Sequence, residues 1–270
     1  MKPMYSNAVI TIVENQLLPL IIFGAVLFAV RLGWWIGHRS HHRSQGQRTS
    51  SDDTLIGAIL GLMGLLIAFS FSGAAARFDQ RTHLIVAEAN TVAAAYDSVS
   101  LLPVARQSGL QARYKDYLTQ RLDLYTDMPD FERYDTKRRA LDAVIQSIDV
   151  ETREAFNETR GDAKALAIEA VRKVGAMRDA YVTQRQAMLF HQPRIIWLSL
   201  LVLVLIGAFL AGYKMGLAQR KERFLTMMFG LLMACAIYLI IIIEFPMLGK
   251  VSLDQYNQEF ENTLNRIPQQ

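Results

Sequence analysis

The stretch that decides the fold is TLIGAILGLMGLLIAFSFSGAAA, residues 54–76. It is almost entirely apolar, and it exceeds the roughly 20 residues that an α-helix needs to cross a hydrocarbon core about 30 Å thick. At about 3.6 residues per turn, its small residues fall on one face of the helix. That face consists of Gly57, Gly61, Gly64, Ala68, Ser72 and Ala75, with Phe71 at its edge. The stretch predicts a membrane helix whose small face lets another helix approach closely.

Two interpretations of this small face stay open. In the first, it packs against another membrane helix of the same chain. In the second, copies of the face from several chains meet around an axis, where small side chains leave a path for ions and Phe71 forms an apolar constriction. The candidates for pore lining or helix packing are Gly57, Gly61, Gly64, Ala68, Phe71 and Ser72.

Three further apolar runs, residues 17–36, 195–212 and 224–243, complete a predicted set of four membrane helices. The chain then divides into a first transmembrane pair within residues 1–76 with a basic linker, an extramembrane section at 77–194, a second pair at 195–243 and a C-terminal tail at 244–270. The tail has its apolar residues at helical spacing and predicts one more amphipathic helix, with Leu253, Tyr256, Phe260 and Leu264 on one face.

The extramembrane section shows helical periodicity throughout and no β-type alternation. We expect the second membrane helix to continue into water as far as Pro103, and three amphipathic helices to follow. Their predicted inner faces contain Leu110, Tyr114, Tyr117, Leu118, Arg121, Leu124 and Tyr125, then Leu141, Val144, Ile145 and Ile148, then Leu166, Ala170, Val174, Met177 and Tyr181. The sequence thus predicts an all-α protein with a helical bundle inserted between membrane helices two and three.

Composition argues against several functional classes. The net charge is +4, but acidic and basic residues alternate through the middle section, so we expect no nucleic acid partner. The single cysteine, Cys235, lies in an apolar run and is interpreted as a buried small apolar residue. Known catalytic motifs are absent from the sequence, so we expect neither enzymatic activity nor a cofactor.

Two groups of polar residues near the membrane helices need separate consideration. His38, His41 and His42 have a spacing that could hold a metal on a helix, but their Arg-rich and Ser-rich surroundings favour an interfacial loop, and no metal is expected.

Asp79, Arg81 and Glu88 follow the second membrane helix, and Asp79 falls on its glycine face. We take these three as pore-mouth candidates that would bias ion entry. The alternative is a solvated helix face with local ion pairs.

The segment GAILGLMGLLIAFSFSGAAARFDQRTHLIVAEANTVAAAY, residues 57–96, resembles the signature of a bacterial bestrophin-like membrane family. Shared features are a glycine-rich membrane helix, a phenylalanine, an arginine-containing turn and a Glu-Ala-Asn segment. Leu102 and Pro103 match a leucine-proline break of that family. EFPMLGKVSLDQY, residues 244–256, is similar to its Asp-Arg-Pro-Phe-x-Gly pattern, although the arginine is absent and Met247 replaces the aromatic residue.

This resemblance implies a homo-oligomeric ion channel that conducts small anions. The second membrane helix would line its pore and Phe71 would form its neck. The lipid bilayer and further copies of the chain would be its partners. The alternative function is a non-conducting membrane protein with a structural or signalling role, whose helical bundle binds a partner.

The short loops predict the orientation, because Lys and Arg accumulate in cytoplasmic loops. Both loops in question are basic: Arg39, Arg43 and Arg48 lie in residues 37–53, and Lys214, Arg220, Lys221 and Arg223 lie in residues 213–223. We therefore expect a multi-pass protein of the bacterial inner membrane with its helical domain and both termini outside the cytoplasm. Bestrophins keep their long helical region in the cytoplasm, so the charge count and the resemblance differ on this point.

An engineered cysteine near Asp130 tests this orientation. It is expected to react with a membrane-impermeant thiol reagent applied from outside the cytoplasm, because the bundle lies on that side. The unmodified chain controls for reaction at Cys235. Labelling that requires the membrane to be opened from the cytoplasmic side contradicts the prediction.

Overall fold

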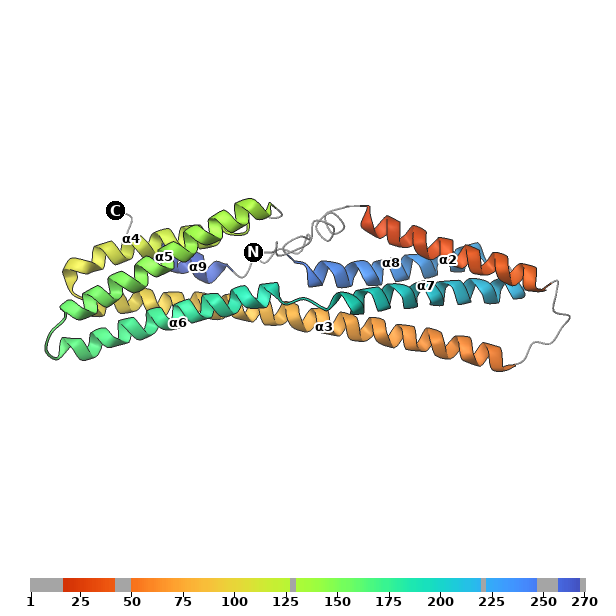
Figure 1. The fold of residues 1–270 in the computed structure, drawn as a ribbon, viewed down its shortest axis with the longest axis horizontal. Coiled ribbons are helices and arrows are strands. Elements are labelled where there is room, and N and C mark those ends of the chain that lie inside the picture. Colours follow the sequence, from red (N-terminus) through yellow and green to blue (C-terminus); the bar gives the residue numbers. More distant parts are fainter. Residues whose placement is uncertain (1–16, 42–49, 127–129, 220–221, 247–256, 268–270) are drawn as a thin grey trace. The chain divides into compact units, whose positions relative to one another are not determined.

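The computed structural model describes residues 17–41, 50–126, 130–219, 222–246 and 257–267, and throughout these ranges it contains helices and no strand (Figure 1). The α-helices are α2 (Leu18–His41), α3 (Ser50–Asp97), α4 (Val104–Asp123), α5 (Phe131–Glu158), α6 (Ala163–Leu189), α7 (Arg194–Leu217), α8 (Arg223–Glu244) and α9 (Gln258–Arg266). A short 3₁₀ helix, η1 (Ser98–Leu101), follows α3. The predicted all-α class is confirmed.

Four of these helices, α2, α3, α7 and α8, are long and apolar enough to cross a membrane. This confirms the four predicted membrane-length helices. Two of them run beyond the predicted apolar runs, since α2 reaches His41 and α7 reaches Leu217. Polar residues can continue a helix past the hydrocarbon core, so the end of an apolar run does not mark the end of a helix. His42 lies outside the described residues.

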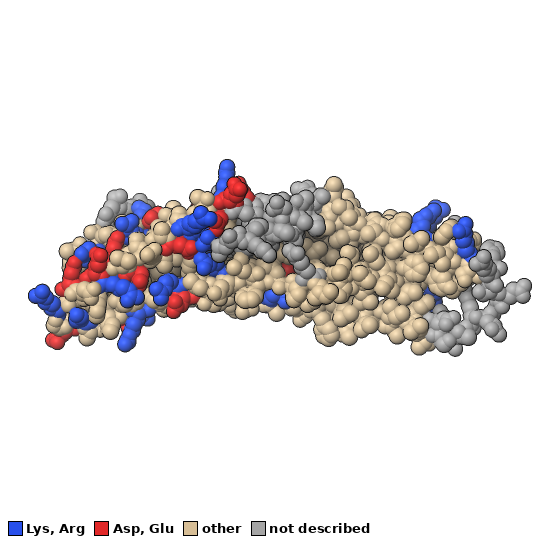
Figure 2. All heavy atoms as spheres, viewed as in Figure 1, with Lys and Arg blue, Asp and Glu red and all other residues tan. Residues whose placement is uncertain are grey.

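Contacts divide the described chain into two compact units. The membrane unit comprises residues 17–41, 50–77, 191–219 and 222–245, and the bundle unit comprises residues 78–126, 130–190, 246 and 257–267. Charged side chains gather over α4, α5 and α6 of the bundle unit, whereas the surface over α2, α7 and α8 is largely uncharged (Figure 2). Cys235 of α8 is exposed on the membrane unit, so its predicted burial is wrong.

The bundle unit encloses one apolar core built from α3, η1, α4, α5, α6 and α9. Most of the predicted inner-face residues are buried there, including Leu118, Ile148 and Met177. Leu166 is an exception, because it is 59% exposed in the first turn of α6. The predicted tail helix is present as α9, whose Phe260 is fully buried, while Leu253 and Tyr256 lie outside the described residues.

The predicted end of the long helix at Pro103 is displaced by several residues. The α-helix ends at Asp97, and η1 tightens the last turn before Pro103 caps α4. The Ser98 hydroxyl donates a hydrogen bond to the carbonyl oxygen of Ala95 over 2.6 Å. Such back-bonding to a neighbouring carbonyl competes with regular helix geometry, which explains the early end.

Helices α2 and α7 of the membrane unit are in direct backbone contact. Each contributes two glycines four residues apart, and a Cβ at any of the four would lie under 3.0 Å from a backbone oxygen of the other helix. The facing pairs are Gly33 with Phe209, Gly37 with Tyr213, Gly212 with Val30 and Gly216 with Trp34. Reciprocal G-x-x-x-G pairs of this kind let two membrane helices approach closely enough for van der Waals and Cα–H···O contacts.

We predict that Gly33→Ala destabilises the membrane unit by about 1–3 kcal/mol, because the added methyl group forces the two backbones apart. Gly24→Ala on the same helix is the matched control, since no described atom lies within 4 Å of a Cβ at that position. Thermal unfolding of the detergent-solubilised chain, followed by circular dichroism, measures both variants. Equal unfolding midpoints for the two would contradict the close α2–α7 contact.

Candidate functional site

Helix α3 contains all the residues singled out for a functional role in the sequence. It has 48 residues, so at about 1.5 Å per residue it is roughly 72 Å long. A hydrocarbon core about 30 Å thick takes up less than half of that length. Residues 50–77 of α3 belong to the membrane unit and residues 78–97 belong to the bundle unit, so the same helix has to pack in two different environments.

One side of α3, which we call the inner stripe, packs against the chain's own helices. It repeats every three or four residues and consists of Met63, Ile67, Ser70, Ala74, Arg77, Arg81, Ile85, Glu88, Val92 and Ala95. In the membrane unit, Met63 packs against Gly207 of α7, and Ala74 packs with Leu200 and Ile240. In the bundle unit, Ile85 and Val92 join the main core. The inner stripe therefore supplies contacts to both units of the chain.

The opposite side, which we call the outer stripe, contains the predicted pore-lining or packing residues. Gly57, Gly61, Gly64, Ala68, Phe71 and Ser72 are all exposed. No described atom lies within 4 Å of a Cβ placed on Gly57, Gly61 or Gly64. Packing of these glycines against another membrane helix of the same chain therefore has no contact to support it among the described residues.

The three pore-mouth candidates separate in the structure. Asp79 is exposed on the outer stripe, whereas Arg81 and Glu88 are buried on the inner stripe and face the interior of the bundle unit. The Arg81 guanidinium donates hydrogen bonds to the carbonyl oxygens of Ala187 and Phe190 at 3.3 and 2.7 Å. Asp79 is therefore the candidate whose side chain is available at the exit of the helix from the membrane unit.

Glu88 forms the centre of a buried polar cluster. Arg121 of α4 donates two hydrogen bonds to its carboxylate, each 2.7 Å long, and the Tyr117 hydroxyl donates a third over 2.9 Å. The side chains of Glu88 and Arg121 are 0% and 1% exposed. A buried ion pair is tolerated only with excellent geometry and additional hydrogen bonds, and this one has both.

Burial and charge set the pKa values around this cluster. Burial disfavours the charged form of Arg121, but the adjacent Glu88 carboxylate more than offsets it and raises the pKa of the guanidinium. Burial, together with the negative charge of Glu88, raises the pKa of Tyr117. The rings of Phe260 from α9 and Tyr125 lie 4.9 and 5.2 Å from the guanidinium carbon. These aromatic faces stabilise the buried cation further.

A second ion pair lies on the inner stripe in the membrane unit. Arg77 donates two hydrogen bonds to one oxygen of Glu244 at 3.0 and 2.8 Å, and Glu244 is fully buried at the end of α8. The backbone N–H of Gln192 donates to the other oxygen of Glu244 over 2.9 Å. This arrangement gives the acidic residue of the EFPMLG segment a structural role, because it joins α3, the chain before α7 and the end of α8.

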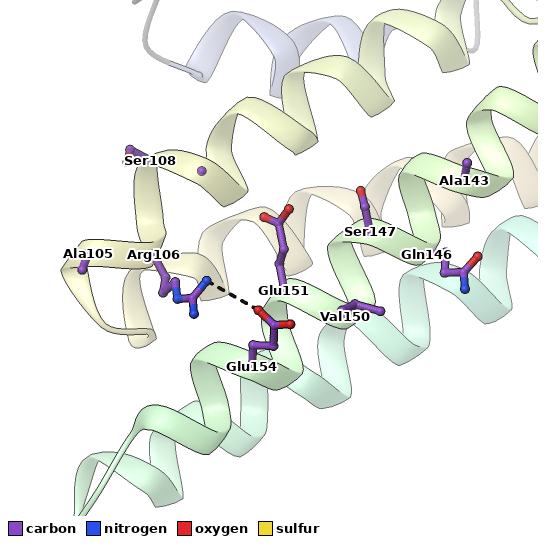
Figure 3. A pocket seen from close by; sticks show the side chains of 10 residues that line it. Ala105, Arg106, Ser108, Ala143, Gln146, Ser147, Val150, Glu151 and Glu154 are labelled. Atoms are coloured by element: carbon purple, nitrogen blue, oxygen red, sulfur yellow. Dashed lines mark ion pairs between the residues drawn. The ribbon is translucent and has the colours of Figure 1, made fainter.

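A groove lies on the bundle unit between α4 and α5 (Figure 3). Small side chains such as Ala105, Ser108 and Ser147 line it, and its charges are paired. Arg106 contacts Glu154 over 3.5 Å, and the Arg113 guanidinium contacts Glu151 over 2.9 Å. The lining contains neither cysteine nor histidine.

Several important residues could have been recognised in the sequence but were not. The four interlocking glycines of α2 and α7 form two G-x-x-x-G patterns, which are a known signal for close helix packing in membranes. Arg121 lies on a predicted apolar face, and a buried arginine requires a carboxylate partner.

Among the described residues, no cluster of three or more metal-ligating side chains is found, and His38 stacks on Trp34 at 4.8 Å. Asn90, of the Glu-Ala-Asn segment, is exposed.

A family model described as the bestrophin-like domain matches residues 23–256, which is most of the chain. No curated protein and no solved structure matches. The matched range contains α3 with both of its stripes, and it includes Glu88, Arg121 and Glu244.

The Glu88–Arg121 pair yields a stability prediction. Arg121→Met alone should cost about 3–5 kcal/mol, because it leaves the Glu88 carboxylate buried without its cation. The double variant Glu88→Gln with Arg121→Met should lose less than the sum of the single changes, because no buried charge remains. Thermal and denaturant unfolding of the full chain measures these differences.

The exposed pair of Arg139 and Asp135 serves as the control. Its arginine side chain is 75% exposed, so Arg139→Met should change stability by less than about 1 kcal/mol. Additive losses for Glu88 and Arg121 would show that the two side chains act independently and would contradict the coupled pair.

Proposed function

The chain belongs to the bestrophin-like family, and we propose that it is a homo-oligomeric ion channel whose α3 helices line the path for ions. It is a multi-pass membrane protein with four membrane-length helices. The observation that carries the proposal is the exposed outer stripe of α3. The glycines Gly57, Gly61 and Gly64 lie on one side of this apolar helix, and no described atom lies within 4 Å of a Cβ placed on any of them.

The chemistry of the membrane explains why this observation supports self-association. Apolar side chains gain little by leaving lipid for protein, so helices associate through close contact between small residues. The outer stripe from Gly57 to Ser72 covers 15 residues of rise, which is about 22 Å and most of the hydrocarbon core. A second copy of the same stripe is a matching surface, and closed rotational symmetry would arrange several copies around one axis.

Phe71 is the proposed neck of the path. It is 40% exposed at the edge of the outer stripe, one turn before the helix reaches Ala75. An apolar ring of this size around an axis would restrict water and ions by dewetting. The small residues on either side of it would leave wider segments.

Measurements of ion flux separate the proposed channel from its alternatives. The family resemblance implies that the conducted ions are small anions. The charged side chains of α3 give independent evidence about which ions pass. A non-conducting structural or signalling protein whose bundle binds a partner is the competing function. The charged surface of α4, α5 and α6 would then be the part that a partner meets.

We predict that Gly61→Leu reduces ion flux through reconstituted liposomes by about tenfold or more, because the bulky side chain obstructs the outer stripe, and no described atom lies within 4 Å of a Cβ at this position. Gly24→Leu is the matched control, as this glycine is exposed on α2 and is not on the stripe. Phe71→Ala should raise the flux by widening the neck. Flux assays with the full chain measure all three variants.

The oligomeric state in detergent gives a second measurement. A monomer, measured by light scattering at concentrations that support flux in liposomes, would remove the axial path. Wild-type liposomes without any ion flux would favour the non-conducting function instead. Equal fluxes for wild type and Phe71→Ala would exclude Phe71 as the neck.

A further inference from the structure

We propose that Asp79 makes the path selective for monovalent cations, an inference that rests on the proposed channel function. It names the class of ion and one residue that selects it, and it departs from the anions implied by the family resemblance. The observations behind it are the directions and the partners of the charged side chains of α3.

Helix α3 has two arginines, Arg77 and Arg81, and no lysine, and both arginines point away from the outer stripe. Arg77 is held by the buried carboxylate of Glu244 in the membrane unit. Arg81 is 1% exposed and donates to backbone carbonyl oxygens in the bundle unit. Neither guanidinium is therefore available to attract anions at the outer stripe.

The acidic side chains of α3 near its exit from the membrane unit are arranged in the opposite way. Glu88 is buried and neutralised by Arg121. Asp79 is exposed on the outer stripe, in register with Gly57, Gly64 and Ser72 at helical spacing. Its carboxylate has no ion-pair partner within the described part of the chain. Between residues 77 and 88, the charged side chains with partners, Arg77, Arg81 and Glu88, lie on the inner stripe. The carboxylate of Asp79 lies on the outer stripe.

The outer stripe has no Lys or Arg along the rest of α3 either. Its further members are His83, Val86, Asn90, Ala93 and Asp97. Asp97 forms an ion pair with Arg266, the last residue of α9. Asp79 is therefore the member whose formal charge is left uncompensated by the described residues.

Symmetry would multiply the effect of this residue. If copies of α3 surround an axis, each contributes one Asp79 carboxylate at the same level, directly after the apolar segment that ends at Ala76. A ring of carboxylates raises the local concentration of cations and repels anions, which is how acidic rings select cations in channels. Nearby low-dielectric walls strengthen this field relative to bulk water.

Reversal potentials in liposomes under a KCl gradient test the proposal. The current through the wild-type protein is expected to change sign near the potassium equilibrium potential. Asp79→Asn should lower the ratio of potassium to chloride permeability by at least about fivefold, because one unit charge at about 4 Å in water already gives that factor and every copy loses one charge. Asp79→Glu should keep the wild-type ratio, because it preserves the charge.

Asp179→Asn is the matched control, since Asp179 is an exposed aspartate on α6 with a side chain 77% exposed. It removes the same charge from the chain and should leave the permeability ratio unchanged. Because the Asp79 side chain has no ion-pair partner among the described residues, its variants should elute from size-exclusion columns as wild type does.

Each outcome has a distinct meaning. A conducting wild type that reverses toward the chloride potential overturns cation selectivity and leaves the channel function intact. A cation-selective wild type with the same ratio in Asp79→Asn overturns the role of Asp79. A wild type that conducts no ions at all overturns the channel function together with this inference.

Discussion

The packing of both units depends on one constraint, which is that α3 must present a suitable inner side in two different environments. In the membrane unit this side is apolar up to Ala74 except for Ser70, because lipid-embedded helices gain from close van der Waals contact. In the bundle unit it remains apolar at Ile85 and Val92 but also includes Glu88. The helix succeeds in both settings because each buried charge on it has a partner from a different helix or a backbone carbonyl. The glycines of the outer stripe do not pack against the described residues of the chain, so their side of the helix is available for contact with another molecule.

The two ion pairs of α3 act on different parts of the chain. Arg77 and Glu244 connect segments of the membrane unit that are 167 residues apart in the sequence. Glu88 and Arg121 connect α3 to α4 inside the bundle unit, together with Tyr117 and the aromatic rings of Tyr125 and Phe260. A buried pair adds little net stability compared with apolar residues, but a mismatched pair is costly. The pairs therefore fix which side of α3 faces inward, because any rotation of the helix would bury a charge without its partner.

The sequence predicts the elements well and their partners poorly, for physical reasons. Length and apolarity identify α2, α3, α7 and α8, since both follow from the thickness of the membrane. Helical periodicity also identifies most of the core of the bundle unit, such as Leu118 and Ile148. The same periodicity does not tell which of two helix sides meets the chain itself, so it left open whether Gly57 and Gly61 pack internally. The pairings of Arg81, Glu88 and Glu244 depend on contacts between distant segments, and a local pattern cannot reveal them. Leu166 shows a further limit, because an apolar residue in the first turn of a helix can remain in solvent.

The glycine contact between α2 and α7 has a consequence for how the chain is made. Helix α2 ends at His41 and α7 begins at Arg194, so 153 positions separate the last residue of one helix from the first residue of the other. At a synthesis rate of about 5–20 residues per second, roughly 8–30 s pass between the end of α2 and the synthesis of the first residue of α7. During that interval Gly33 and Gly37 present an open surface to any helix nearby. The insertion machinery or neighbouring lipids must therefore shield α2 from wrong associations until α7 emerges from the ribosome.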